Sequence, residues 1–104
     1  MKETWVEYYF DVVKKEFDYA TSRFSAFNNA HEGYAVLLEE VDELWENVKL
    51  NQHKNQYRDK LIMNEAIQVA AMAMRVVHDC CEKVFLDHHV FPLEKKKKED
   101  DKNE

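Results

Sequence analysis

Apolar residues recur at helical spacing in three segments of the chain, and these segments predict three helices. In the first segment the apolar positions fall three or four residues apart from Val6 to Phe24. Residues at this spacing lie on one face of an α-helix, so they form a single apolar stripe. Thr4 and Glu7 have the form of a capping box, and we expect the first helix to span residues 4–27.

The second segment begins with the same kind of capping signal. Asn28 and Asn29 interrupt the first helix, and Asn29 with Glu32 repeats the capping-box pattern. Apolar residues then recur at helical spacing as far as Val48, which predicts an amphipathic second helix. The polar stretch that follows, residues 51–59, predicts a loop or a frayed helix end.

The third segment, residues 59–86, differs because it is apolar nearly all round between Leu61 and Val77. A helix with this pattern has to be buried on most sides, and three helices of one small chain cannot easily surround it. We therefore expect an all-α bundle of three main helices, completed by oligomerisation as a homodimer or homotetramer whose interface includes the region of Met72.

A strip of polar residues interrupts this apolar helix within about 80° of its circumference. Buried carboxylates are costly unless they are paired or metal-bound, so such a strip favours a site. Glu40 and Glu43 on the second helix could complete it, because they lie one turn apart beside the edge of that helix's apolar face. The residues of the strip are Glu65, Gln68, Arg75 and Asp79.

Two interpretations of the acids on the second helix remain open. Glutamate is a strong helix former and 35% of the chain is charged, so the acids could simply be solvated surface. Alternatively, they could bind a cation, which would relieve a repulsion of a few tenths of a kcal/mol between neighbouring carboxylates. The second polar strip favours the cation.

The composition limits the class of protein. A chain of 104 residues can form one domain, which we place at residues 1–93, and the charged residues 94–104 predict a disordered tail. A net charge of −6 argues against binding to duplex nucleic acid. The sequence has neither a bilayer-spanning apolar run nor the layout of a signal peptide, so we expect no membrane association and a cytoplasmic location.

The cysteines and histidines add only weak candidates. The adjacent Cys80 and Cys81 fit a reducing compartment and are interpreted as core thiols. The run Asp87–His89 could bind a stray divalent ion, although a surface role is the commoner explanation.

The acids of both helices resemble a known pattern. The stretch from Glu39 to Glu43, followed after about twenty residues by Glu65 at the start of an apolar helix, is similar to the MazG-type all-α nucleotide pyrophosphohydrolases. The resemblance covers roughly residues 27–80. The first motif is matched in full, whereas Gln68 stands where the family has aspartate in the second.

This resemblance implies a magnesium-dependent enzyme that hydrolyses (deoxy)nucleoside triphosphates to the monophosphate and pyrophosphate. It implies Glu39 as the residue that orients the attacking water. The implied magnesium ligands are Glu40, Glu43, Glu65 and Gln68. The implied contacts to the substrate phosphates are Lys54, Arg58 and Arg75.

The same residues bear on two other classes of protein. Gln68 removes one negative charge from the metal site, so an inactive helical oligomerisation module or nucleotide sensor is the alternative to an enzyme. A di-iron carboxylate bundle would need a Glu-x-x-His motif on two helices, and the sequence contains none.

Overall fold

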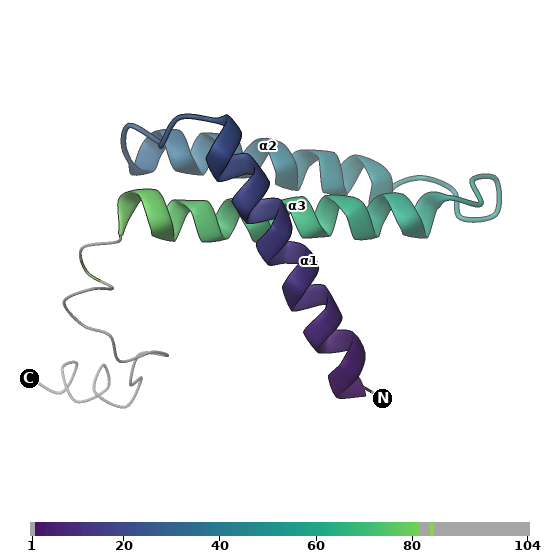
Figure 1. Cartoon of the computed structure of the whole chain (residues 1–104). Helices are drawn as coiled ribbons and strands as arrows, with labels where there is room; N and C mark the ends of the chain where they lie inside the picture. Colours follow the sequence, from purple (N-terminus) through teal and green to yellow (C-terminus); the bar gives the residue numbers. More distant parts are fainter. Residues whose placement is uncertain (1, 82–83, 85–104) are drawn as a thin grey trace, which may run out of the picture.

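The chain folds into three α-helices in the computed structural model, which describes residues 2–81 and 84 (Figure 1). Helix α1 spans Lys2–Arg23, α2 spans Ala30–Val48 and α3 spans Arg58–Cys80. The described residues contain no β-strand, which confirms the all-α prediction. None of these three helices is long and apolar enough to cross a membrane.

Helices α2 and α3 form an antiparallel hairpin, and α1 crosses it obliquely (Figure 1). Helix α1 packs on α3, and the N-terminal end of α1 extends away from the hairpin. This arrangement places the second and third helices side by side along most of their lengths. Side chains on their facing surfaces can therefore meet, as the proposed acid site requires.

The start of α2 follows the predicted capping signal. Asn29 is the N-cap, and its Oδ1 accepts a hydrogen bond of 2.9 Å from the Glu32 amide. The Glu32 carboxylate in turn accepts from the amide of Asn28, one residue before the position that a capping box uses. Two amides that the helix itself cannot satisfy thus find partners, and this fixes where α2 begins.

The predicted ends of α1 were wrong at both termini. The helix begins at Lys2, so Thr4 lies inside it rather than at its cap, because lysine and glutamate at residues 2 and 3 are themselves good helix formers. It ends at Arg23, four residues before the predicted end, because Ser25 and Phe27 of the following segment bond to α3 instead of continuing the helix.

Helix α3 begins one residue before the predicted start and ends earlier than predicted, at Cys80. The amide of Cys81, the residue after the helix, donates to the Val77 carbonyl over 2.9 Å. Of the predicted extension beyond Cys81, the structure describes Val84 alone. The run Asp87–His89 and the tail 94–104 lie outside the described residues.

The chain by itself covers little of its apolar surface. The buried apolar side chains in the described part are Ala20, Ala71 and Met72. On α3, Met74 and Val77 remain 38% and 47% exposed. The other helices of the chain therefore do not surround α3, in agreement with the prediction from its sequence. Met72 itself is already buried within a single chain, so its burial does not require a second copy. The predicted oligomer interface around this region remains a prediction.

The two cysteines also differ from expectation. Cys80 is half-buried and Cys81 is exposed, and both are free thiols. The interpretation as core residues was therefore wrong for Cys81. The reason is that α3 ends at Cys80 and does not carry the next residue along its packed face.

Candidate functional site

Three glutamates from two helices converge between α2 and α3. Glu40 and Glu43 lie one turn apart on α2, and Glu65 lies in the N-terminal half of α3. One carboxylate oxygen from each of these residues lies within 4.8 Å of the other two. We call these three residues the acid cluster.

The environment of the acid cluster disfavours three negative charges. Burial, assisted by the charges of Glu43 and Glu65, raises the pKa of Glu40 to about 7. Burial and the charge of Glu43 also raise the pKa of Glu65. Within the described residues, no salt bridge reaches any of the three carboxylates. A cation at this point would remove a repulsion that the protein itself does not neutralise.

The acid cluster fits a hard divalent cation. Magnesium takes oxygen ligands at about 2.1 Å in octahedral geometry, so two oxygens bound to one ion lie about 3 to 4 Å apart. The observed limit of 4.8 Å is close to this range, and small side-chain rotations would close the difference. Glu65 Oε1 is also buried without a hydrogen-bond partner among the described residues, as expected for an oxygen that a cation would satisfy.

Two further predicted residues lie next to the acid cluster along the helices. Gln68 is half-buried and follows Glu65 by one turn of α3, so it shares the same side of that helix. Glu39 is exposed and precedes Glu40, and its charge contributes to raising the pKa of Glu40. The roles predicted for these two residues remain predictions.

Two of the three basic candidates have partners within the chain. Arg75 is buried, and its Nη2 donates to the Ser25 carbonyl over 2.8 Å. Arg58 Nη2 donates to the Val48 carbonyl over 2.8 Å, which closes the α2–α3 loop. Lys54 is exposed in that loop. The anchoring roles of both arginines could not be predicted from helical periodicity, because their partners are backbone carbonyls outside the helix that carries them.

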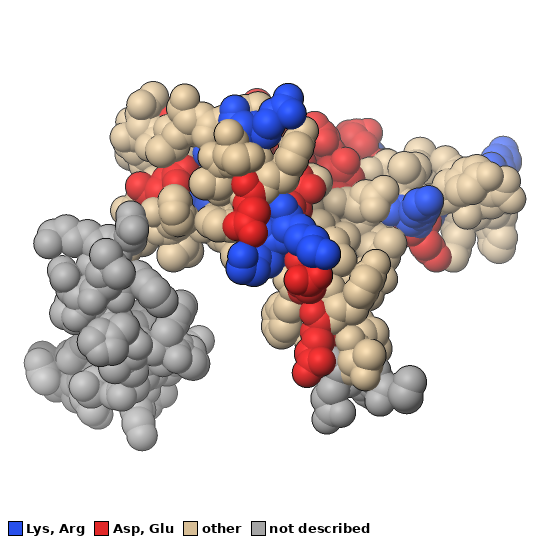
Figure 2. All heavy atoms as spheres, viewed as in Figure 1, with Lys and Arg blue, Asp and Glu red and all other residues tan. Residues whose placement is uncertain are grey.

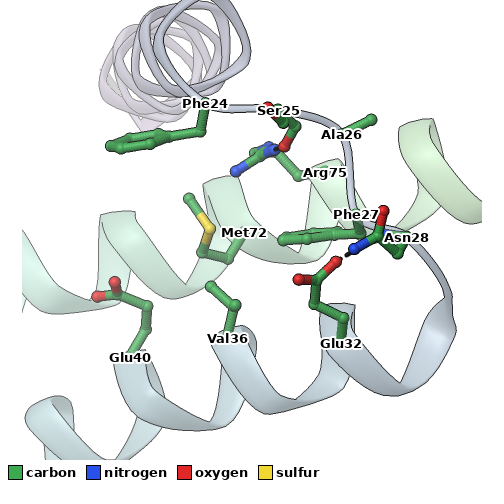
Figure 3. Close-up of a pocket in the computed structure, with 10 residues that line it drawn as sticks. All are labelled: Phe24, Ser25, Ala26, Phe27, Asn28, Glu32, Val36, Glu40, Met72 and Arg75. Atoms are coloured by element: carbon green, nitrogen blue, oxygen red, sulfur yellow. Dashed lines mark hydrogen bonds between the residues drawn. The ribbon is translucent and has the colours of Figure 1, made fainter.

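A pocket of about 510 Å³ adjoins the acid cluster (Figure 3). Glu40 belongs to its lining, and Met72 and Val36 of the two hairpin helices face it (Figure 3). The opposite wall is the α1–α2 loop, which contributes the rings of Phe24 and Phe27. The acid cluster therefore lies at the edge of a cavity large enough for part of a small organic ligand.

Charges of both signs alternate on the face of the molecule that carries α1 (Figure 2). Lys14 pairs with Asp18 at 2.9 Å, and Lys15 pairs with Asp11 at 3.1 Å. These exposed i,i+4 pairs contribute little stability, but they leave no extended basic patch on this face. On this face the described residues do not form the basic stripe typical of a duplex-binding protein.

Comparison of the chain with protein-family models, with curated proteins and with solved structures finds no match. The functional interpretation therefore depends on the chemistry of the acid cluster and on the motif that its residues form.

Proposed function

We propose that the protein is a magnesium-dependent nucleoside triphosphate pyrophosphohydrolase that releases pyrophosphate from a nucleotide, with a deoxynucleotide as the preferred substrate. The observation that supports this proposal is the convergence of Glu40, Glu43 and Glu65 from two helices, where no cationic side chain of the described residues pairs with them. A bridging cation would allow a protein with a net charge of −6 to hold a polyanionic triphosphate at a cluster of carboxylates.

The residues of the site divide into three groups by role. Glu40, Glu43 and Glu65 would hold the cation, and the amide oxygen of Gln68 would add a fourth oxygen ligand. When bound, magnesium polarises the scissile phosphoryl group, lowers the pKa of a bound water and neutralises charge on the pyrophosphate. Glu39 accepts a hydrogen bond from the attacking water and orients it. Lys54, the exposed cation of the α2–α3 loop, contacts the phosphates.

We further propose that the protein works as a homo-oligomer in the cytoplasm. The large apolar residues that remain exposed on a single chain favour association with a second copy. Free cysteines fit a reducing compartment.

A nucleotide-binding module without turnover is the second candidate. The observation that favours it is the commitment of Arg58 and Arg75 to partners within the chain, which leaves fewer cations for the phosphates. Gln68 also favours the nucleotide-binding module, because an amide contributes no charge to the metal site.

Pyrophosphate release from a panel of nucleoside triphosphates, assayed with and without magnesium, tests the enzyme. We expect turnover only with magnesium, and we expect Glu43→Gln to lower kcat by about 100-fold or more, because it removes a ligand charge while it preserves shape and helix propensity. Glu46→Gln is the matched control: it makes the same change one turn further along α2, where Glu46 forms an exposed pair with Lys49.

Gln68→Asp separates the two candidates. If glutamine only weakens an otherwise competent site, the restored carboxylate should tighten magnesium binding and preserve or raise turnover. If both the wild type and this variant leave every nucleotide intact, the enzyme proposal is wrong and the binding module takes its place.

A further inference from the structure

The loop between α1 and α2 is held in place by two buried side chains of α3. The Phe27 amide donates to Asp79 Oδ2 over 3.0 Å, and Arg75 Nη2 donates to the Ser25 carbonyl over 2.8 Å. The same Arg75 nitrogen reaches Asp79 Oδ2 at 3.3 Å. The side chains of Arg75 and Asp79 are only 4% and 2% exposed, so these bonds form where water competes little. We call this arrangement the loop clamp.

The clamped loop is also the wall of the pocket beside the acid cluster. Phe24, Ser25 and Phe27 line the cavity from the loop, and Arg75 lies between them and Met72 (Figure 3). The guanidinium of Arg75 lies 4.4 Å from the centre of the Phe27 ring. The clamp therefore holds both the backbone of the wall and the orientation of one of its aromatic rings.

The second oxygen of Asp79 is also engaged. Its Oδ1 lies 2.7 Å from Nδ1 of His78, whose ring packs edge-on against Phe17 of α1. Burial acts to raise the pKa of Asp79, but hydrogen bonds from His78 and the Phe27 amide, together with the charge of Arg75, lower it below its ordinary value. Asp79 is therefore ionised at neutral pH and can hold the loop continuously.

We infer that Asp79 is a positioning residue for substrate binding: with Arg75 it fixes residues 24–28 as the wall that receives the part of the substrate beyond the phosphates. This inference rests on the proposed function, because the acid cluster supplies the site for the phosphates. None of the clamp residues belongs to the acid cluster, so the clamp should govern substrate affinity and leave the bound cation unaffected.

Steady-state kinetics of full-length variants with the four deoxynucleoside triphosphates and magnesium test the inference. For the nucleotide that the wild type hydrolyses best, we expect Asp79→Asn to raise KM at least tenfold and to change kcat less than threefold. His78→Phe keeps an aromatic ring against Phe17 but removes the donor to Asp79 Oδ1, and we expect it to raise KM three- to tenfold. Asp18→Asn makes the same chemical change as Asp79→Asn in an exposed pair on α1 and should leave KM unchanged.

Two measurements separate positioning from loss of structure. The rise in melting temperature on addition of magnesium should persist in both clamp variants, because the acid cluster is intact. Hydrogen exchange of the Phe27 amide, followed by NMR, should accelerate in Asp79→Asn, which removes the carboxylate that accepts from it. It should accelerate less in His78→Phe, where the bond is kept but Asp79 is held by one partner fewer. If Asp79→Asn does not fold, His78→Phe decides the result, because its side chain is 47% exposed and its loss leaves the other clamp bonds in place.

The failures of the two proposals are distinguishable. An active wild type with unchanged KM in the folded clamp variants, or with an effect on kcat alone, overturns the inference and leaves the proposed function standing. A wild type that neither binds nor hydrolyses any of the four nucleotides overturns the proposed function, and the inference with it.

Discussion

At the scale of single residues, Glu40 links protonation, metal binding and stability. Its pKa is about 7 in the folded protein, well above the ordinary value of about 4.3 for an exposed glutamate. Between these two values the folded state holds a proton that the unfolded chain releases. The ionisation of Glu40 should therefore lower the free energy of unfolding of the metal-free protein as the pH rises from about 4.3 to 7. Above pH 7 it should cause little further change.

Glu40→Gln removes the titrating group and tests this linkage. Without metal, the variant should melt at a higher temperature than the wild type at pH 8, and the difference should shrink or vanish at pH 5. Magnesium should raise the melting temperature of the wild type at pH 8, because a ligand at 100 times its Kd stabilises the folded state by about 2.7 kcal/mol. It should stabilise the variant far less. The measurement is the melting temperature of the wild type, Glu40→Gln and the control Glu46→Gln at both pH values, with and without magnesium. If magnesium does not change the melting temperature of the wild type, the acid cluster is not a metal site.

The sequence predicted the acid cluster better than it predicted the basic residues. Glu40, Glu43 and Glu65 could be located because each lies beside an apolar stripe, and the stripes determine which faces of two helices pack together. Arg75 has partners more than 45 residues away, in a loop whose path depends on tertiary packing. Helical periodicity carries no information about such contacts.

At the scale of elements, the close approach of α2 to α3 depends on Gly33. A Cβ atom at this position would lie 3.1 Å from Cδ2 of Phe27 and 3.3 Å from Cγ2 of Val76. Both distances are shorter than ordinary van der Waals contact, so any side chain here displaces the neighbouring groups. Glycine inside a helix destabilises it by about 1 kcal/mol relative to alanine. The close packing explains why glycine is nevertheless found at this position.

We therefore expect Gly33→Val to destabilise the protein by about 1–3 kcal/mol through overpacking. Gly33→Ala should have a smaller effect, because the gain in helix propensity offsets the contact with Phe27. Ala35→Val is the matched control, since it places the same β-branched side chain at an exposed position of α2. Urea unfolding measures all three variants. Equal effects of valine at residues 33 and 35 would show that helix propensity, and not the contact with Phe27, determines the result.

The helix boundaries show where local signals suffice. Asn29 begins α2 as predicted, because capping is a local interaction between residues three positions apart. The end of α1 at Arg23 could not be predicted in this way, since Asp79 and Arg75 of α3 bind the loop that follows. The prediction for the third helix overestimated its length because apolar periodicity extends beyond the last residue of α3.

At the scale of the whole molecule, exposed apolar side chains are the main unexplained feature. Phe10 is 71% exposed, Trp45 is 56% exposed and Val77 is 47% exposed, and these residues come from three different helices. Burial of a large apolar side chain contributes roughly 1.5–3 kcal/mol relative to its exposure. A second copy of the chain is the simplest way to gain this free energy, and the N-terminal end of α1, which extends away from the hairpin, offers a surface for it (Figure 1).

We expect light scattering at micromolar concentration to give a mass of at least twice the 12.5 kDa of one chain. Phe10→Gln should weaken association about 30-fold if this side chain is central to the interface, because such anchors contribute about 2 kcal/mol or more. Tyr57→Gln is the control, since Tyr57 is 62% exposed at the end of the α2–α3 loop and its substitution should leave the mass unchanged. A wild type that is a well-folded monomer at micromolar concentration would show that the exposed apolar residues do not mediate self-association.

The three carboxylates of the acid cluster come from one chain, so a dissociated but folded variant should still bind magnesium. Loss of magnesium binding on dissociation would show that the site requires the second copy.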